Sequence, residues 1–497
     1  MGEGADEEED LFNNLPDVFL TYIVSFLPAT DAARTSVLSH RWKTMWKYSS
    51  RLSFDQREML KSLIKVYIEK YDQNKRIELA MLRREIPLKY ANAFLDPIAR
   101  AALLMKSTID NHIGPLKNCS IRHMLESCAS GDVVRWMKKL LEKGVVNVSL
   151  ELESHDLQNI SCHLTIFGEI LCMPFDVLTS FKVLELKNYY LKTTLSPNSH
   201  QVLNTLTLNN IRVESNDFEN ILSQCSSLEN LTLKKCNLFG DGVKIDSPSL
   251  KYFKFFDMTV HKMLISATKI EVIEIGTIIC YNEDLIFETP NLHVIRICND
   301  VKNLGRHLAT RDIVEICSGI SVRHGCMRSI FDNLVTLCLD LDFTNNRNAI
   351  ALSFALKSSH QLKNLQINNQ VNMDYIYNGG VTDQNDNACL PYPGVLFWEK
   401  REPCRCVIYQ LKSLCIRGYT GGEFEYEFVK YLILNGGVIE NITLWFLDDC
   451  SWNKVVATNC LLSYPKLSSK LSFDLKPGAI FARKYSGSFN KWVTTLR

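Results

Sequence analysis

A six-residue pattern, apolar-x-x-apolar-x-apolar, recurs at nearly constant spacing and constrains the fold of this chain more than any other feature. It appears as FKVLEL (181–186), LNTLTL (203–208), LENLTL (228–233), LKYFKF (250–255), IEVIEI (270–275) and LHVIRI (292–297). Successive copies start 22, 25, 22, 20 and 22 residues apart. One hexamer would match many buried strands, but a run of copies at this period is typical of a solenoid, in which each repeat packs on its neighbours.

The spacing within each hexamer predicts where its side chains point. Alternate side chains of an extended strand lie on opposite faces, so the first, fourth and sixth residues should pack inward. The polar residues between them should face solvent on a parallel sheet, which we expect to form the concave face. Stretches between hexamers, such as Glu214–Ser226, should supply helices or turns on the convex side. The predicted fold class is therefore α/β.

The period and the longer run LENLTLKKCNL (228–238) resemble leucine-rich repeats. Cys236 holds the turn position in that run, and the corresponding residues elsewhere are Tyr189, Ile211, Met258, Ile278 and Asp300. We therefore expect an incomplete turn ladder and an irregular solenoid.

Beyond residue 300 the repeat loosens. Further hexamers are LVTLCL (334–339), LKNLQI (362–367), LKSLCI (411–416) and IENITL (439–444), which start 28 to 49 residues apart. The longest insertion, Asn368–Arg405, is either a recognition loop or a covering loop.

The N-terminal segment LPDVFLTYIVSFLPATDAARTSVLSHRWKTMW (15–46) predicts three short helices. Leu15-Pro16 should open the first helix, whose apolar residues at helical spacing are Val18, Leu20, Ile23, Val24 and Leu27. Pro28 should end it, with Thr30 or Asp31 as the cap of the second helix. So short a segment has too small a core to stand alone, so it packs either on a partner or on its own chain.

This segment resembles the F-box of plant F-box proteins with leucine-rich repeats, through its LP pair, its SFLP stop, its DAARTSVLS block and its R-W…W ending. The resemblance implies docking to the Skp-type adaptor of a cullin-RING ubiquitin ligase. The residues it assigns to the adaptor contact are Leu15, Pro16, Ile23, Leu27, Val37, Leu38 and Trp42. Ile23, Leu38 and Trp42 also compete for a place in the small core of the segment itself.

Two further regions complete the organisation. Residues 55–143 are expected to be mostly helical, with apolar faces at Met59–Tyr71 and Val133–Lys143, before a first solenoid strand in VVNVSLELE. The run IRGYTGGEFEYEFVKYLI, with Trp398 before it, resembles the FBD module of plant F-box proteins. Its pattern predicts a strand, a Gly-Gly turn, a helix over Glu423–Asn435 and another strand that caps the open end of the solenoid. The predicted domains are an F-box (8–54), a helical connecting region (55–143), a leucine-rich-repeat solenoid with insertions (144–410) and an FBD-like cap (411–480).

Net charge, apolar runs and cysteine spacing limit the kinds of partner and the compartment that we expect for this chain. With 56 basic and 55 acidic residues the formal charge is +1, so we expect neither nucleic acid nor membrane as a partner. The acidic start MGEGADEEED lacks the features of a secretory signal, and no apolar run reaches transmembrane length. Seventeen cysteines without framework spacing fit free thiols in a reducing compartment, which predicts a cytoplasmic or nuclear protein or both.

No catalytic motif stands out. The glycines from Gly418 to Gly422 lack the lysine and the spacing of a phosphate-binding loop, and neither HExxH nor paired CxxC occurs. The CxC spacing of Cys404 and Cys406 is poor for zinc. We therefore expect a protein with no metal or cofactor that is not itself an enzyme.

The combined prediction is a substrate-recognition subunit, in which the F-box docks to the ligase and the repeats hold a target protein near the ubiquitin-conjugating enzyme. The candidate target contacts are the exposed hexamer positions Lys182, Glu185, Asn204, Thr207, Asn230, Thr232, Lys254, Glu274 and Arg296. Two alternatives stay open: a scaffold that binds the adaptor without degradation, and a small-molecule co-receptor, which would need Arg and Lys clustered on the strands.

Overall fold

The repeating hexamers form parallel strands in the computed structural model. The structure describes residues 12, 15–60, 88–124, 127–128, 130–153, 175–178, 180–192, 202–276, 278–297, 333–341, 343, 346–369, 397–447 and 452–478. The chain divides into two compact units, Met1–Gly240 and Asp241–Arg497. The expected α/β class with parallel strands is confirmed in both units.

The first unit begins with short helices. They are α1 (Asp17–Val24), α2 (Ala29–Arg34) and the 3-10 helices η1 (Thr35–Val37) and η2 (Trp42–Tyr48). Pro16 and Pro28 stand directly before α1 and α2, where a missing N–H leaves no intrahelical bond unmade. Thr30 and Asp31 lie inside α2, so the prediction that either caps it is wrong. The third predicted helix, which carries Trp42, forms as the 3-10 helix η2.

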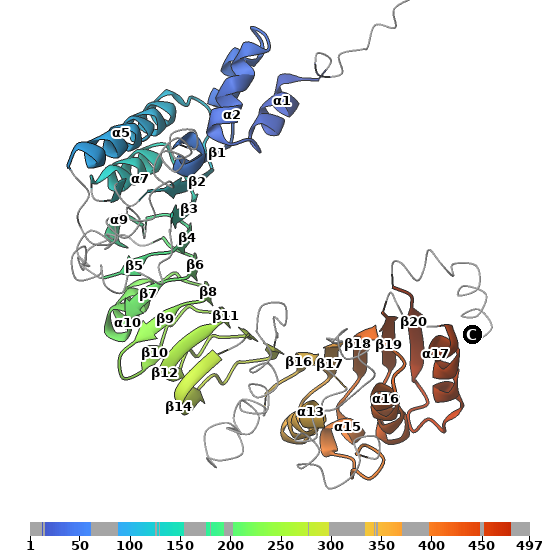
Figure 1. Ribbon diagram of the computed structural model, residues 1–497. Helices are drawn as coiled ribbons and strands as arrows, with labels where there is room; N and C mark the ends of the chain where they lie inside the picture. Colours follow the sequence, from blue (N-terminus) through green and yellow to red (C-terminus); the bar gives the residue numbers. More distant parts are fainter. Residues whose placement is uncertain are drawn as a thin grey trace, which may run out of the picture. The chain divides into compact units, whose positions relative to one another are not determined.

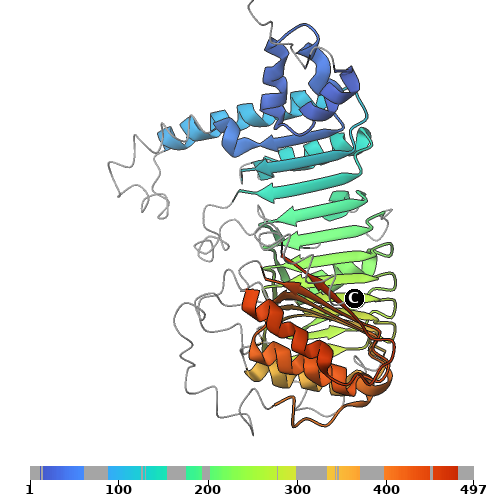
Figure 2. The same ribbon diagram turned by 90° about the vertical axis from the view of Figure 1, so that its right-hand side faces the viewer.

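Parallel strands follow in one sheet of the first unit. In sheet order they are β1 (Arg51–Asp55), β2 (Asn118–His123), β3 (Asn147–Leu152), β4 (Val183–Lys187), β6 (Thr205–Asn209) and β8 (Asn230–Lys234). Figure 2 shows β2 to β8 one below another with their arrows in the same direction. Leu228, Leu231 and Leu233 are buried, which confirms the inward direction predicted for the first, fourth and sixth hexamer residues.

The sheet starts earlier in the chain than the sequence suggested. The strand in VVNVSLELE is β3 and comes third, because β1 and β2 precede it. The region predicted to be helical holds β2 between the helices α5 (Leu88–Asn111) and α7 (Asp132–Glu142). The helix predicted over Val133–Lys143 is α7, with Gly144 beyond it at a φ of 71°. The helix predicted over Met59–Tyr71 lies outside the described residues from 61 onward.

Three short parallel strands of the first unit belong to a second sheet. They form the second set of strands in this unit and are β5 (Tyr190–Leu191), β7 (Arg212–Glu214) and β9 (Asn237–Phe239), accompanied by the helices α9 (Phe175–Leu178) and α10 (Ser215–Gln224). Helices α5, α7 and α10 all lie on one side of the β2–β8 row (Figure 1). Helix α10 fills the Glu214–Ser226 stretch, as predicted.

Four of the described turns between the two sets of strands use a residue in the left-handed conformation. Asn188, Asn210 and Lys235 have φ values of 67°, 53° and 53°, and Asp257 in the second unit has 51°. They stand one residue before the predicted turn positions. The predicted positions Tyr189, Ile211, Cys236 and Met258 are buried, and the Cys236 thiol donates to the Leu208 and Lys234 carbonyls at 3.4 and 3.3 Å.

The asparagines also build a partial ladder. The Asn188 Nδ2 donates to the Leu152 carbonyl at 2.8 Å, and the Asn210 Nδ2 donates to Asn188 Oδ1 at 2.9 Å. Asparagine tolerates the left-handed region better than most residues, which explains its use here. Among the predicted turn positions, Asp300 lies outside the described residues.

The second unit continues the same architecture. Its main parallel sheet runs β11 (Tyr252–Phe256), β13 (Val272–Ile275), β15 (Val294–Ile297), β16 (Thr336–Leu341), β17 (Asn364–Asn369), β18 (Ser413–Tyr419), β19 (Asn441–Phe446) and β20 (Ser472–Lys476). The parallel strands β10 (Val243–Ile245), β12 (Met258–Ile265) and β14 (Ile278–Phe287) form its second set. Its helices are α13 (Asn346–Ser358), α15 (Arg405–Tyr409), α16 (Glu423–Asn435), α17 (Trp452–Ala457) and the 3-10 helix η7 (Thr458–Ser463).

The C-terminal module forms as its pattern predicted. Strand β18 leads through Gly421, at a φ of 68°, into α16, whose bounds are those expected, and then into β19. Trp398 lies against Phe428 and Tyr431, with ring centroids 4.7 and 5.2 Å apart. All three side chains are buried, so this aromatic cluster is the core of the module. Most of the insertion at Asn368–Arg405, residues 370–396, lies outside the described residues, and its proposed recognition role stays a prediction.

Candidate docking and recognition surfaces

The N-terminal helices enclose a very small core. Its buried side chains are Leu20, Val24, Ala32 and Met45, and Leu15, Leu27, Trp42 and Trp46 pack against them half-buried. Leu20 and Val24 are four residues apart, so they form one stripe of α1. A core of this size leaves most of the α1 surface uncovered.

One arginine fixes the start of α1. The Arg41 Nε donates to Asp17 Oδ1 at 2.7 Å, and its Nη2 donates to the Leu15 carbonyl. The guanidinium therefore joins the residue before η2 to the first turn of α1, 24 residues earlier. A planar group with several donors suits this double contact.

Large apolar side chains of this segment remain exposed, and together they form the docking face. Its members and their exposed fractions are Val18 (77%), Phe19 (56%), Tyr22 (61%), Ile23 (38%), Phe26 (58%), Val37 (86%) and Leu38 (64%). At 100° per residue, the α1 members span an arc of roughly 140° opposite the Leu20 and Val24 stripe. The Tyr22 and Phe26 rings meet edge to face at 4.9 Å. Contiguous apolar exposure of this kind marks an interaction site.

The residues that the sequence assigned to the adaptor fall into two groups. Pro16, Ile23, Val37 and Leu38 are exposed. Leu15, Leu27 and Trp42 are half-buried against the small core. The sequence analysis missed Phe19, Tyr22 and Phe26 as exposed residues, and it grouped the exposed Val18 with the buried Leu20 and Val24. Helical spacing alone places Phe19, Tyr22 and Phe26 on another side of the helix from Leu20 and Val24, and this could have identified them.

We call the half-exposed side of the main sheet in each unit its recognition face, after the predicted target contacts. The nine predicted target contacts all lie on or beside it and none is buried. Register places Glu185, Thr207 and Thr232 on adjacent strands of the first unit. There the Asn230 Nδ2 donates to the Thr205 hydroxyl at 3.2 Å, and Asn204 accepts from the same hydroxyl at 3.2 Å. This stretch therefore presents hydroxyl and amide groups beside the Glu185 carboxylate.

In the second unit the recognition face carries a charged cluster. Register places Lys254, Glu274 and Arg296 side by side. The Glu274 carboxylate lies 2.8 Å from Lys254 Nζ and 2.5 Å from Arg296 Nη1. The same guanidinium nitrogen donates to the Tyr252 hydroxyl at 2.7 Å. Partial burial raises the pKa of Glu274, but hydrogen bonds from the two cations outweigh it, so the net pKa lies below its usual range.

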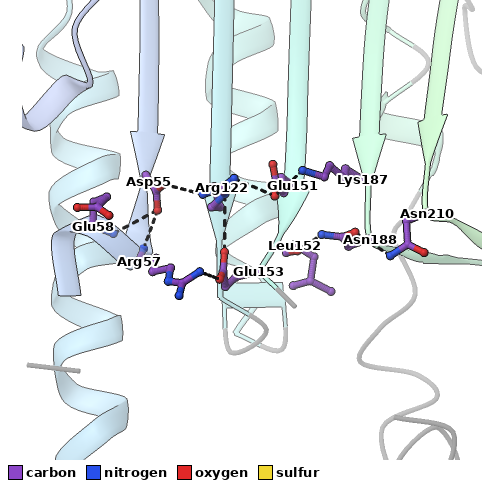
Figure 3. A network of polar contacts seen from close by, with 10 residues as sticks. All are labelled: Asp55, Arg57, Glu58, Arg122, Glu151, Leu152, Glu153, Lys187, Asn188 and Asn210. Atoms are coloured by element: carbon purple, nitrogen blue, oxygen red, sulfur yellow. Dashed lines mark hydrogen bonds and ion pairs between the residues drawn. The ribbon is translucent and has the colours of Figure 1, made fainter. Parts of the chain in front are cut away.

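A polar network connects the end of the N-terminal segment to the repeats (Figure 3). Arg122 on β2 lies 3.2 Å from Asp55 on β1 and 3.0 Å from Glu151 on β3. Lys187 on β4 reaches the same Glu151 carboxylate at 2.8 Å. Burial raises the pKa of Glu151, but the hydrogen bonds from Lys187 and Arg122 lower it by a larger amount. The net pKa lies below its usual range, so the carboxylate stays ionised.

A second contact strengthens this join. Arg57, just after β1, lies 2.7 Å from Glu153, just after β3. The charges alternate in sign across four neighbouring strands, so β1 is tied to the repeat strands by side chains as well as by the backbone. This network could not be predicted from the sequence, because it depends on the register of neighbouring strands.

Two further observations concern the described part of the chain. Within it, no group of three or more His, Cys, Asp or Glu side chains could hold a metal ion. No helix there is both long and apolar enough to cross a membrane.

Comparison with known families assigns each region. Residues 12–54 match the model of the F-box domain. Residues 133–367 match a model described as the leucine-rich repeats of FBD-associated F-box protein At5g56370, and residues 399–444 match the FBD model. The chain is a plant F-box/leucine-rich-repeat protein with a C-terminal FBD. The FBD match begins before the predicted boundary at 411 and takes in α15.

Relatives of this F-box/leucine-rich-repeat protein carry F-box, LRR-repeat or FBD in their names. From Arabidopsis thaliana, F-box protein At1g80960 is 24% identical over 88% of this chain and 83% of its own length. FBD-associated F-box protein At5g22730 is 23% identical over 93% of both chains. Putative F-box/LRR-repeat protein At3g42770 is 25% identical over 93% of this chain and 80% of its own length. The similarity to these relatives therefore extends over most of this chain and of theirs.

Proposed function

We propose that this protein is the substrate-recognition subunit of an SCF-type cullin-RING ubiquitin ligase. The observation that carries the proposal is the docking face, which belongs to the part of the chain that matches the F-box domain. F-box proteins in general bind Skp-type adaptors. The protein itself performs no chemistry, and catalysis comes from other subunits.

The docking face has the composition of a protein interface. Fully burying one Val, Leu or Phe side chain stabilises a complex by roughly 1.5–3 kcal/mol. Val18, Tyr22 and Val37, each more than half exposed, would therefore supply much of the free energy of a stable complex even after the entropy of association is subtracted. Pro16, Ile23 and Leu38 extend the contact, while Leu15, Leu27 and Trp42 support it from the core.

The recognition face is proposed to hold the target protein. Thr207 and Thr232 offer neutral hydrogen bonding, and Glu185, Lys254 and Arg296 offer charge. Binding there raises the local concentration of target lysines near the conjugating enzyme. A few of these positions should carry most of the affinity.

The charged cluster favours a protein target over a phosphate-bearing small molecule. Lys254 and Arg296 already share the Glu274 carboxylate, which offsets part of their positive charge. A phosphate pocket would need cations without such a partner. We also propose a cytoplasmic or nuclear location, a compartment that suits the free thiols of the described cysteines.

A pull-down with purified Skp-type adaptor tests the proposal. Tyr22→Asp with Val37→Asp places two charges on exposed positions of the docking face, so the fold should survive while adaptor affinity falls at least 100-fold. Leu103→Asp with Leu104→Asp is the matched control, because these α5 residues are also apolar and are 64% and 60% exposed.

Each outcome has a clear meaning. Adaptor and cullin recovered with wild type and with the α5 variant, but not with the docking-face variant, support the proposal. Equal recovery with all three proteins would place the adaptor contact elsewhere, and no recovery with any would reject the ligase assignment. Thermal unfolding of the three proteins shows whether the substitutions left the fold intact.

A further inference from the structure

Two cysteines of the second unit lie two residues apart beside a hollow in the protein. Cys404 stands directly before α15 and is half-buried, whereas Cys406 lies in the helix and is 1% exposed. Both are free thiols. Neither belongs to the docking face or to the recognition face.

The hollow gives small molecules access to Cys404. Its volume is about 30 Å³, room for about one water-sized molecule, and Trp398, Cys404 and Tyr431 are among its lining residues. Its charged lining residues are Lys357, Arg401 and Glu402, so two cations and one carboxylate surround the opening.

Hydrogen bonds from four groups lower the pKa of Cys404. They are the Cys406 thiol, the Val407 backbone N–H, the backbone N–H of Cys404 itself and the Tyr431 hydroxyl. The Cys406 hydrogen bond makes the largest contribution, and together with the other donors it outweighs burial and lowers the pKa of Cys404 to about 6. The same contact and burial raise the pKa of Cys406, so the proton stays on Cys406.

We propose that Cys404 and Cys406 form a peroxide-responsive thiol pair, in which Cys404 is attacked first and Cys406 closes a disulfide. The Cys404 thiolate attacks hydrogen peroxide: an S–O bond forms, the O–O bond breaks, and the released hydroxide takes a proton to become water. Cys406 then loses its proton and attacks the sulfenic sulfur, an S–S bond forms, and the hydroxyl leaves as a second water. Two thiols lose two electrons in total, and one peroxide becomes two waters.

The surroundings of the pair give the oxidation a structural consequence. Tyr431 donates to Cys404 and also belongs to the aromatic cluster with Trp398. A disulfide removes the thiolate that accepts this hydrogen bond. Oxidation therefore acts on the core of the FBD module while leaving the F-box untouched.

The first test is the pH dependence of alkylation in the full-length protein. Iodoacetamide reacts with the thiolate, so the labelling rate of Cys404 should level off above pH 7, and that of free N-acetylcysteine in the same tube should keep rising to about pH 8.5. The ratio of the two rates should fall about 100-fold between pH 6 and pH 9, whatever the accessibility of Cys404. A constant ratio would overturn the proposal.

The second test uses hydrogen peroxide and mass spectrometry of the Cys404–Cys406 peptide. Wild type should lose two hydrogens as the disulfide forms, and the exposed Cys460 serves as the reference thiol. Cys406→Ser should instead accumulate a sulfenic acid that dimedone traps, and Tyr431→Phe should move the alkylation midpoint to higher pH. Sulfenic acid on wild type without a disulfide, or modification of Cys460 before Cys404, would contradict the assignment.

Discussion

At the N-terminal end of the chain, α1 leaves Phe19 and Tyr22 exposed, whereas the C-terminal FBD buries Trp398, Phe428 and Tyr431 against one another. Both regions are short helical modules beside parallel strands. The FBD completes its core from its own residues, while the F-box segment keeps its aromatic side chains on the surface. Aromatic content alone therefore does not distinguish a cap from a docking module, but the burial of the rings does.

The largest difference in stability is expected when one aromatic ring is removed from the FBD and one from α1. Phe428 is fully buried and contacts Trp398 and Phe343, so Phe428→Ala should lower the free energy of unfolding of the second unit by about 3–5 kcal/mol. Phe19→Ala, at a 56% exposed position, should change stability by only about 0.5 kcal/mol. Urea unfolding monitored by fluorescence measures both. Similar losses would show that the α1 rings are structural.

The stability of the FBD should depend on pH through the buried carboxyl group of Glu425. Burial raises the pKa of Glu425 to about 7, although the Thr420 backbone N–H and hydroxyl donate to it at 2.8 and 3.1 Å. A folded-state pKa above the unfolded value means that the contribution is fully present below about pH 4.5 and is lost as pH rises to about 7. The loss should reach about 3 kcal/mol relative to Glu425→Gln, whose stability lacks this titration. Parallel slopes for the two proteins between pH 4.5 and 8 would refute the prediction.

The first unit should respond to pH in the opposite direction. Burial lowers the pKa of His123 to about 4; its Nδ1 donates to the Met124 carbonyl and its Nε2 accepts from the Tyr189 hydroxyl. A depressed histidine pKa means that stability is fully present above about pH 6.5 and falls by up to about 3 kcal/mol as pH drops to 4. His123→Gln should flatten this slope, and His40→Gln, at an exposed position, should leave it unchanged. Urea midpoints at pH 4.5, 5.5 and 7 measure it.

The smallest effect concerns the join between the F-box and the repeats. Arg122→Met removes the charge that links Asp55, Glu151 and Glu153, and should destabilise the first unit by about 1 kcal/mol, less in 1 M salt. Arg34→Met is the matched control, because Arg34 pairs with Asp31 while 80% exposed, and it should have almost no effect. A loss that is equal in low and high salt would mean that packing of the Arg122 stem, rather than its charge, holds the join.

The sequence predicts the strands well wherever the apolar alternation is long. Leu206 and Leu208, with Leu203 before them, are all fully buried, as period-two spacing requires. The strands β1 and β2 escape notice because RLSFD is short and NCSIRH buries the polar-looking His123 and Cys119. A strand whose inward residues are not aliphatic gives no apolar signal.

The sites are harder to predict for different reasons. On α1 apolar residues occur almost all the way round, so spacing cannot tell whether Val18 or Leu20 faces inward, and only the position of Met45 on η2 decides. The contact of Arg122 with Glu151 requires the register of β2 against β3, which local sequence does not encode. The spacing of the hexamers predicts that Lys254, Glu274 and Arg296 lie on adjacent strands. It does not predict that the two cations share the Glu274 carboxylate.

The left-handed residues Asn188, Asn210, Lys235 and Asp257 end their strands at the same place in each repeat. Because the corner is encoded within each repeat, the segment that follows can be lengthened, shortened or replaced without disturbing the strand before it. Under the proposed function, one repeat could therefore change its target contacts while the strands beside it and the F-box segment keep their structure.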